Sequence, residues 1–233
     1  MTGVLYGVGV GPGDPELITR KAWALIESAR VIAYPVLENA SSFARRIAED
    51  AISRDAREIE ILIPMSVERA PAQAAYDTGA EEIAAALRAG EDVVVLCEGD
   101  PFFYGSFMYL HARLRDEFRV EVVPGVSSLM ACAAVSGQPL SARNEVLTIL
   151  PGPLDDAELA DKIRDAGSVA IMKIGRHFER IKSVVAELGL LEQAYFVKYA
   201  SLPEEGVTPL SEMEGPAPYF SMILINRVRD PWL

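Results

Sequence analysis

The stretch Cys97-Glu98-Gly99-Asp100-Pro101-Phe102-Phe103-Tyr104-Gly105-Ser106 decides how this chain folds. A buried-strand run, Val93 to Leu96, precedes it, and a helical run, Phe107 to Leu114, follows it. Gly99 allows backbone angles that other residues avoid, and Pro101 has a fixed φ and no N–H to donate. The chain must therefore turn at the carboxyl end of the strand, where open α/β sheets bind their ligands. From these ten residues alone, a ligand-binding turn and an ordinary strand-to-helix turn are equally good interpretations.

The N-terminal strand, Val4 to Val10, enters a glycine-rich turn, Gly7-Val8-Gly9-Val10-Gly11-Pro12-Gly13-Asp14. Asp14 is a plausible helix cap, with Pro15 at the first helical position. The turn is not the dinucleotide fingerprint G-x-G-x-x-G, because Pro12 and Gly13 interrupt the spacing. The next strand also lacks the acidic residue that holds a ribose, and no Gly-Lys-Ser/Thr follows as in NTPases. A tight turn that needs small residues is the plainer alternative.

Strands and helices alternate along the chain, which predicts a mainly parallel sheet with helices on both faces in the first part. We expect strands at 4–10, 31–34, 58–63, 93–96, 120–123, 145–150, 168–172, 193–199 and 219–228. We expect helices at 15–26, 42–51, 72–88, 107–114, 129–136, 155–165 and 176–188, with loops at 64–71 and 200–206. Gln138-Pro139-Leu140 reads as a linker. The prediction is two α/β domains: residues 1–139 with a doubly wound sheet, and residues 140–233 with a smaller mixed sheet.

Composition excludes several classes of protein. The chain has 233 residues, 50% of them hydrophobic, and a net charge of −12. That charge argues against general nucleic-acid or membrane-surface binding. Cys97 and Cys132 show neither zinc-site spacing nor a disulfide framework, so we expect no metal site and a reducing cytoplasm. We find no signal peptide at the N-terminus and no apolar run near the roughly 20 residues that cross a bilayer.

Five motifs in this order resemble the tetrapyrrole methylases, which make cobalamin and sirohaem precursors, and the match covers essentially the whole chain. The motifs are Gly7-x-Gly9-x-Gly11-Pro12-Gly13-Asp14, Gly99-Asp100-Pro101 with Tyr104-Gly105, Pro124-Gly125-Val126-Ser127-Ser128, Met172-Lys173 and Tyr199-Ala200-Ser201. Within the family, the context from Glu98 to Leu110 looks most like the precorrin-2 C20-methyltransferases. Those enzymes methylate a meso carbon of precorrin-2 to give precorrin-3A.

The resemblance implies a homodimer, with S-adenosylmethionine bound in a cleft between the two domains. The cofactor contacts that it implies are Pro12, Glu98, Gly99, Asp100, Phe103, Ser127, Ser128, Met172 and Ala200. Most of these contacts are expected from backbone atoms, which fits a motif of Gly and Pro. The glycine-rich turn is expected near the tetrapyrrole, so the candidate substrate residues include Gly11, Gly13, Asp14, Arg143 and Arg176.

Methyl transfer from a sulfonium needs no metal and no covalent enzyme intermediate, but the reaction must remove the C20 proton. Glu98 and Tyr104 are the candidate catalytic residues because they are nearest the central motif, and His111 and His177 are the only imidazoles. Precorrin-2 carries many carboxylates, which arginine binds well. The basic candidates are Arg20, Arg45, Arg46, Arg143, Arg176, Lys173 and Lys198; simple surface charge is the alternative for each.

Four other functions stay open at this point. They are the same methylation on a cobalt-containing substrate (cobalt-factor II), methylation of a precorrin at a different ring position, a methylase-like domain that binds a tetrapyrrole or nucleotide without catalysis, and a dinucleotide-dependent oxidoreductase. The retained Gly99-Asp100-Pro101 and Pro124-Gly125 argue modestly against a non-catalytic domain. The interrupted glycine spacing argues against the oxidoreductase.

Overall fold

The structure is a computed structural model that describes residues 2–65 and 68–227. Its strands are β1 (Val4–Gly9), β2 (Val31–Leu37), β3 (Arg57–Ile63), β4 (Val93–Cys97), β5 (Arg119–Val123), β6 (Leu147–Pro151), β7 (Ser168–Met172), β8 (Ala194–Lys198), β9 (Gly206–Pro209) and β10 (Ser221–Ile225). Its α-helices are α1 (Arg20–Ser28), α2 (Phe43–Ile47), α3 (Arg69–Arg88), α4 (Phe107–Leu114), α5 (Ser128–Ser136), α6 (Asp156–Arg164) and α7 (Phe178–Glu187). Short 3-10 helices are η1 (Pro15–Leu17), η2 (Glu49–Ala51), η3 (Gly175–His177) and η4 (Leu191–Gln193).

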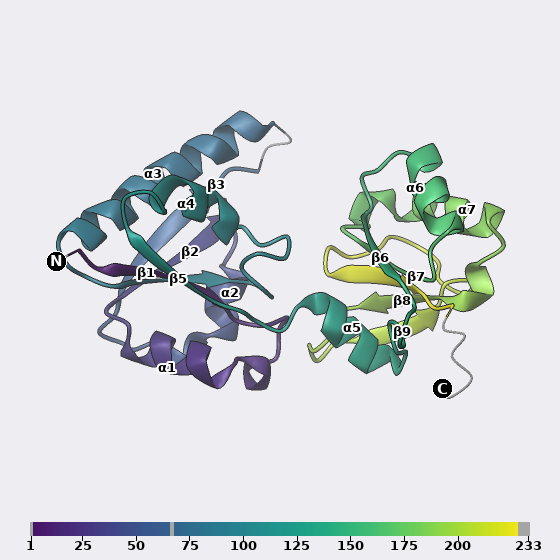
Figure 1. The fold of residues 1–233 in the computed structure, drawn as a ribbon, viewed down its shortest axis with the longest axis horizontal. Helices are drawn as coiled ribbons and strands as arrows, with labels where there is room; N and C mark the ends of the chain where they lie inside the picture. The colour runs from purple at the N-terminus through teal and green to yellow at the C-terminus, as the bar shows by residue number, and fades with distance from the viewer. Residues whose placement is uncertain (1, 66–67, 228–233) are drawn as a thin grey trace. The chain divides into compact units, whose positions relative to one another are not determined.

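The chain forms two compact α/β units that divide between Ser127 and Ser128. In the first unit, the strands run parallel in the order β3-β2-β4-β1-β5. Helices α3 and α4 cover one face of this sheet and α1 and α2 cover the other (Figure 1). This is the doubly wound parallel sheet that the alternation of strands and helices predicts.

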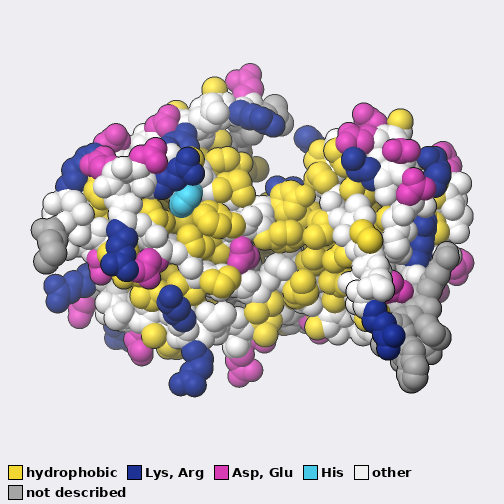
Figure 2. Space-filling model, in the orientation of Figure 1, with side chains coloured by type: hydrophobic (Ala, Val, Ile, Leu, Met, Phe, Trp, Pro, Cys, Tyr) yellow, Lys and Arg dark blue, Asp and Glu magenta, His cyan; other side chains and the backbone are white. Residues whose placement is uncertain are grey.

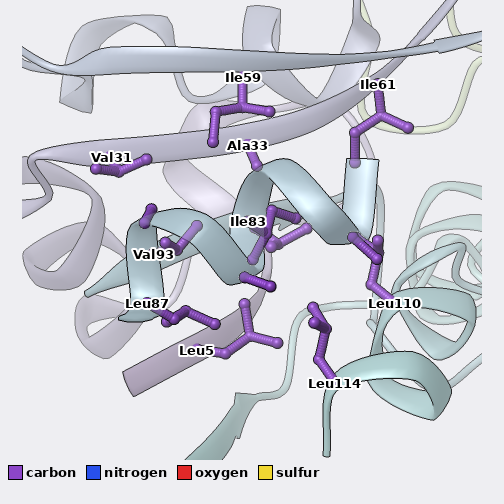
Figure 3. Close-up of a cluster of buried hydrophobic side chains, with 14 of the residues drawn as sticks. Leu5, Val31, Ala33, Ile59, Ile61, Ile83, Leu87, Val93, Leu110 and Leu114 are labelled. Carbon is purple, nitrogen blue, oxygen red and sulfur yellow. The ribbon is translucent and has the colours of Figure 1, made fainter. Parts of the chain in front are cut away.

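The strand sequences explain the two-sided burial. Successive side chains of a strand point to opposite faces, so a strand covered on both faces is apolar throughout. In β4, Val93 and Val95 join the cluster under α3 and α4, whereas Val94 and Leu96 join the cluster under α1 and α2. Figure 3 shows the first cluster, with side chains of β1 to β4 meeting those of α3 and α4.

The second unit holds a mixed sheet in the order β6-β7-β10-β8-β9. Only β6 and β7 pair in parallel, and the other neighbours are antiparallel. Helices α6 and α7 contribute Leu159, Ile163 and Ile181 to the core of this unit, and α5 contacts strands β8, β9 and β10. The smaller mixed sheet is therefore confirmed.

The division between the units lies earlier than the boundary at 139/140 that the linker Gln138-Pro139-Leu140 suggests. The reason is that α5 packs on the second sheet. The linker is also attached to that sheet, because the side chain of Asn226 donates hydrogen bonds to the side chain of Gln138 and the carbonyl of Pro139, both at 3.1 Å.

Several element bounds differ from the sequence prediction, and the following three differences have a clear physical reason. The first helix is interrupted, because Asp14 caps only η1 and Thr19 then caps α1. Strand β2 continues through Pro35, which is possible because its pairing with β4 ends at Ala33 and no donor is needed on that side. Strand β9 lies in a polar segment with no strand pattern, and its pairing with β8 is what forms it.

Several large apolar side chains are exposed on the surface. Figure 2 shows apolar side chains on the surface of each unit, and the exposed ones include Phe102, Tyr104, Met108 and Tyr109. Among the residues that the structure describes, no helix combines the length and the apolar character that crossing a bilayer requires. The part of the predicted loop 64–71 at residues 66–67 and the end of the predicted last strand at residue 228 lie outside the described residues.

Candidate functional site

Three loops of the first unit meet at the carboxyl edge of its sheet. They follow β1, β4 and β5, which are neighbours in the order β4-β1-β5. The first two loops are bonded through their glycines: Gly99 N–H donates to the carbonyl of Gly11 at 2.8 Å, and Gly11 N–H donates to the carbonyl of Gly99 at 3.3 Å. The glycine-rich turn and the central motif, far apart in sequence, thus form one wall.

The third loop approaches this wall so closely that only glycine fits. A Cβ added to Gly125 would lie 2.0 Å from the carbonyl oxygen of Gly99. A Cβ added to Gly9 would lie 2.6 Å from the same oxygen and from the nitrogen of Gly125. The glycines of the three motifs therefore allow three backbones to touch, and this contact is independent of any ligand.

Asp100 holds the central motif in shape. One oxygen of its carboxylate accepts hydrogen bonds from the backbone N–H groups of Phe102 at 2.9 Å and Phe103 at 3.1 Å. Its other oxygen accepts from the N–H of Gly125 at 3.1 Å. The Asp100 side chain thus joins the central motif to the third loop, so its first role is to shape the candidate site.

The turn after Asp100 contains backbone strain. Tyr104 has a φ of 55°, which side-chain-bearing residues seldom adopt, and its ring packs edge-on against Phe103 at 5.2 Å. A Cβ on the next residue, Gly105, would lie 2.5 Å from the carbonyl oxygen of Asp100. Strained residues cluster at ligand-binding sites, and the exposed Tyr104 ring is placed here by such a turn.

Glu98 begins the central motif with an unusual carboxyl group. Its side chain reaches solvent, yet surrounding protein raises its pKa by desolvation, while the positive charge of Arg46 acts in the opposite direction. Because the side chain is exposed, the effect on stability is smaller than for a fully buried group. A carboxyl with a raised pKa beside an aromatic turn is a suitable proton acceptor or cation ligand.

The glycine-rich turn contributes mainly backbone. Gly11 has a φ of 82°, Gly13 is buried, and Pro12 is half-buried. The carboxylate of Asp14 accepts the N–H of Glu16 at 2.9 Å, so Asp14 acts as a cap as its sequence position predicts. The hydrogen bonds between Gly11 and Gly99 place this turn beside the central motif.

The second unit brings another set of predicted residues together. Strands β7 and β8 are both antiparallel to β10, so their carboxyl ends lie at the same edge of the sheet. Met172 ends β7, and Ala200 follows β8 and is buried. Lys173, Tyr199 and Ser201 all have positive φ values, of 58°, 50° and 71°. As in the first unit, loops with positive-φ residues follow strands that point in the same direction.

The two arginine candidates of the second unit, Arg143 and Arg176, lie in different segments of the chain. Arg176 lies in η3 after β7, with its Nε 3.4 Å from Nε2 of His177. Desolvation and the neighbouring charges of Arg176 and Arg180 lower the pKa of His177. Arg143 lies in the segment between α5 and β6 and has a φ of 48°.

Arg45 does not remain available as a substrate ligand. Its guanidinium binds the carboxylate of Glu58 through two hydrogen bonds, of 2.8 and 3.1 Å, and the hydroxyl of the buried Tyr34 donates to the same carboxylate. The sequence could not reveal this network, because it depends on the register that puts Ile32 beside Glu58 and Tyr34 beside Glu60. Phe107 is also not a site residue: it is 1% exposed and its ring lies against Gly7.

The described part of the chain contains no group of three or more His, Cys, Asp or Glu side chains placed to hold a metal ion. The loops at the sheet edge of the first unit instead offer backbone N–H and carbonyl groups, aromatic faces and one carboxyl of raised pKa. Such a set suits an organic ligand with a positive charge.

Comparison with known proteins agrees with this arrangement. The model of the tetrapyrrole (corrin/porphyrin) methylases matches residues 4–214. A precorrin-2 C(20)-methyltransferase of Sinorhizobium sp. is 39% identical over 98% of this chain and 97% of its own length. A cobalt-precorrin-2 C(20)-methyltransferase of Salmonella typhimurium is 32% identical over 97% of this chain and 98% of its own length.

Comparison with solved structures identifies the same fold. The uroporphyrin-III C-methyltransferase of Thermus thermophilus, in complex with S-adenosylhomocysteine, superposes with a TM-score of 0.69 and 26% identity, covering 96% of this chain and 92% of that one. The family match spans both α/β units, all five motifs and the glycine wall. The chain belongs to the tetrapyrrole methylases.

Proposed function

We propose that this chain is an S-adenosylmethionine-dependent C-methyltransferase of cobalamin biosynthesis that methylates precorrin-2 at C20 to give precorrin-3A. The observation that carries the proposal is the 39% identity to a precorrin-2 C(20)-methyltransferase over nearly the whole length of both chains. The site adds physical support, because the three motif loops of the first unit are held against one another by close backbone contacts and hydrogen bonds.

The residues at the two edges fit the proposed cofactor. S-Adenosylmethionine supplies an electrophilic methyl group on a positively charged sulfur. Glu98 offers a carboxyl, and Phe103 and Tyr104 offer ring faces, which attract cations. The other proposed cofactor contacts are made mainly by backbone atoms. They come from Pro12, Gly99, Asp100, Ser127, Ser128, Met172 and Ala200.

The main contribution of the chain to the reaction is placement. Orienting two bound reactants in line can lower a barrier by roughly 7–11 kcal/mol. The Asp100 carboxylate and the Gly99–Gly11 hydrogen bonds fix the loops before any ligand binds, so little reorganisation is needed on binding. We propose that the glycine-rich turn contacts the substrate through Gly11, Gly13 and Asp14. Arg143 and Arg176 are the proposed basic contacts.

The proton lost from C20 needs an acceptor, and we propose Glu98 or Tyr104. Desolvation raises the pKa of the Glu98 carboxyl toward the operating pH, which improves a carboxylate as a base. The strained backbone at Tyr104 presents its hydroxyl-bearing ring outside the core. Loss of catalysis with unchanged cofactor affinity in Glu98→Gln or in Tyr104→Phe would identify the acceptor.

One alternative substrate has a specific observation behind it. The Salmonella typhimurium relative that acts on cobalt-precorrin-2 is 32% identical over almost the whole chain. Any cobalt would belong to the substrate, so the chain itself needs no metal ligands for this reaction. Parallel assays with the metal-free and cobalt-containing substrates separate the two, and the higher identity to the Sinorhizobium enzyme favours the metal-free substrate.

Calorimetric titration tests the cofactor. We expect S-adenosylhomocysteine to bind with micromolar affinity and NAD, the control ligand, to give no heat of binding. Binding of NAD instead would favour a dinucleotide-dependent enzyme. No binding of S-adenosylhomocysteine would leave the fold in place but remove the cofactor and the methyltransferase proposal.

We further propose a homodimer located in the cytoplasm. Exposed apolar side chains on α4, Met108 and Tyr109, are suited to an interface. Cys97 and Cys132 are both free and buried, and burial raises the pKa of the Cys132 thiol to about 12, so neither thiol is reactive. Light scattering of the purified protein at micromolar concentration tests the dimer; a monomer mass would contradict it.

A further inference from the structure

Arginines in the first unit fall into two groups, according to whether they are used within the fold. Most form ion pairs with acidic partners. Arg20 and Arg46, from the two helices on one face of the sheet, form no ion pair with any residue in 2–65 or 68–227, and neither do Arg30, Arg54 and Arg69. Arg20 and Arg46 both belong to helices that follow the carboxyl ends of strands, where the three glycine loops meet.

Arg45 and Arg46 are neighbours on α2, but their guanidinium groups have different partners. Arg45 is held by Glu58 and lies 3.6 Å from Glu49, so its charge is already compensated. Arg46 is exposed, and its guanidinium carbon lies 4.8 Å from the centre of the Phe43 ring. Stacking on an aromatic face orients a guanidinium without using its N–H donors. Arg46 therefore keeps its fork of donors for another group.

The position of α2 directs this fork toward the candidate site. Helix α2 packs against β4, whose carboxyl end carries Glu98 and the central motif. The positive charge of Arg46 lowers the pKa of the Glu98 carboxyl, as expected for a guanidinium on a helix that packs against β4. A short helix has little rigidity of its own, and the hydrogen bonds that join Tyr34, Glu58 and Arg45 fasten this one to β2 and β3.

We propose that Arg46 binds a carboxylate of the tetrapyrrole substrate, and that Tyr34, Glu58 and Arg45 are positioning residues that hold Arg46 in place. This inference rests on the proposed function, since precorrin-2 supplies the carboxylates. Arginine binds carboxylates with two parallel hydrogen bonds, which lysine cannot do.

The first test compares Arg46→Ala with Arg54→Ala in the full-length protein. Arg54 is exposed and precedes β3, so its variant removes the same charge at the opposite edge of the sheet. Loss of a charged hydrogen-bonded contact predicts a roughly ten- to hundredfold rise in the KM for precorrin-2 in Arg46→Ala. We expect kcat and the calorimetric Kd for S-adenosylhomocysteine to stay within about threefold, and Arg54→Ala to match wild type.

Arg46→Lys provides a second variant that keeps the charge. If the fork matters, Lys restores only part of the affinity; complete restoration would overturn the bidentate assignment. An unchanged KM in Arg46→Ala, or an equal loss of cofactor affinity, would overturn the substrate contact. Wild-type protein that binds S-adenosylhomocysteine but methylates no precorrin overturns the proposed substrate and this inference together, whereas wild-type turnover with an unaffected Arg46→Ala overturns this inference alone.

The positioning role is tested by a double-mutant cycle. Glu58→Gln should raise the KM severalfold without changing kcat or the cofactor Kd, and Glu58→Gln should have no further effect in the Arg46→Ala background. A purely structural role for Glu58 would lower the melting temperature and affect both backgrounds equally. Equal effects on KM in the two backgrounds would therefore overturn the positioning role, and melting curves confirm that each variant is folded at the assay temperature.

Discussion

Gly125 is the residue whose surroundings tolerate a change least. The space that a side chain at position 125 would need is occupied by the backbone of Gly99 and Gly9. This backbone cannot move aside as a flexible side chain can. We expect Gly125→Ala to lower the free energy of unfolding by about 3 kcal/mol or more, at the upper end of overpacking effects. Urea denaturation of the purified variant measures this.

A matched control is Gly137→Ala at the end of α5. No atom lies within 4 Å of a Cβ at this position, so only the strain of its φ of 63° remains. That strain costs about 1–2 kcal/mol. Equal destabilisation by the two substitutions would mean that the close contact of the three loops is not what requires glycine at 125.

The Glu98 carboxyl makes the stability of the protein depend on pH. Its pKa is raised in the folded state, so the folded protein holds this proton more tightly than the unfolded chain does. The contribution of Glu98 to stability is therefore fully present below its unfolded pKa of about 4.3 and is lost as the pH rises through the folded pKa.

We accordingly expect Glu98→Gln to melt at a higher temperature than wild type at pH 7, with a smaller advantage or none at pH 4. Differential scanning calorimetry at the two pH values checks this, with Glu16→Gln, a change to an exposed residue of η1, as the control. The opposite trend, an advantage for wild type that grows with pH, would show that the site favours the ionised carboxylate.

Helix α1 depends on a cap at Thr19, whereas the sequence pattern predicts the cap at Asp14. The hydroxyl of Thr19 accepts the N–H of Ala22 at 3.2 Å. Thr19→Ala should cost about 1 kcal/mol of unfolding free energy, whereas Ser28→Ala, at the other end of the helix, should stay within about 0.5 kcal/mol. Denaturant titration of both variants measures the loss of unfolding free energy. Equal losses in the two variants would show that Thr19 does not act as the cap.

Elements with a strong hydrophobic pattern could be predicted closely from the sequence. Strand β7 and helix α4 begin and end where the sequence indicates, because each is bounded by turn residues and packs an apolar side or run. Strand β9 could not be predicted, because its residues become a strand only by pairing with β8. The break before α1 also escaped prediction, because either Asp14 or Thr19 could start a helix and the choice between them depends on tertiary packing.

The candidate site was predictable to the extent that it is local in sequence. Turns with Gly and Pro after strands mark the loops at the two sheet edges, and the structure groups the loop residues accordingly. Contacts between distant segments were not predictable. The three bonds accepted by Asp100 and the Tyr34–Glu58–Arg45 network need the strand order and register, which a single sequence does not contain.

For the whole molecule, ligand binding should appear as added stability. A ligand at a hundred times its Kd raises the free energy of unfolding by about 2.7 kcal/mol. At roughly 2–4 °C per kcal/mol for a chain of this size, S-adenosylhomocysteine should raise the melting temperature by about 5–10 °C. NAD at the same concentration should give no shift, and an equal shift with NAD would contradict the proposed cofactor.

The most direct test of the proposed activity is to follow the methyl group. Purified protein is incubated with precorrin-2 and S-adenosylmethionine whose methyl carbon is ¹³C, and the product is analysed by NMR and mass spectrometry. The proposed function predicts one new labelled methyl group, bonded to C20 of the macrocycle, and one equivalent of S-adenosylhomocysteine. A labelled methyl on another carbon would contradict the regiospecificity, and no labelled product despite bound S-adenosylhomocysteine would contradict precorrin-2 as the substrate.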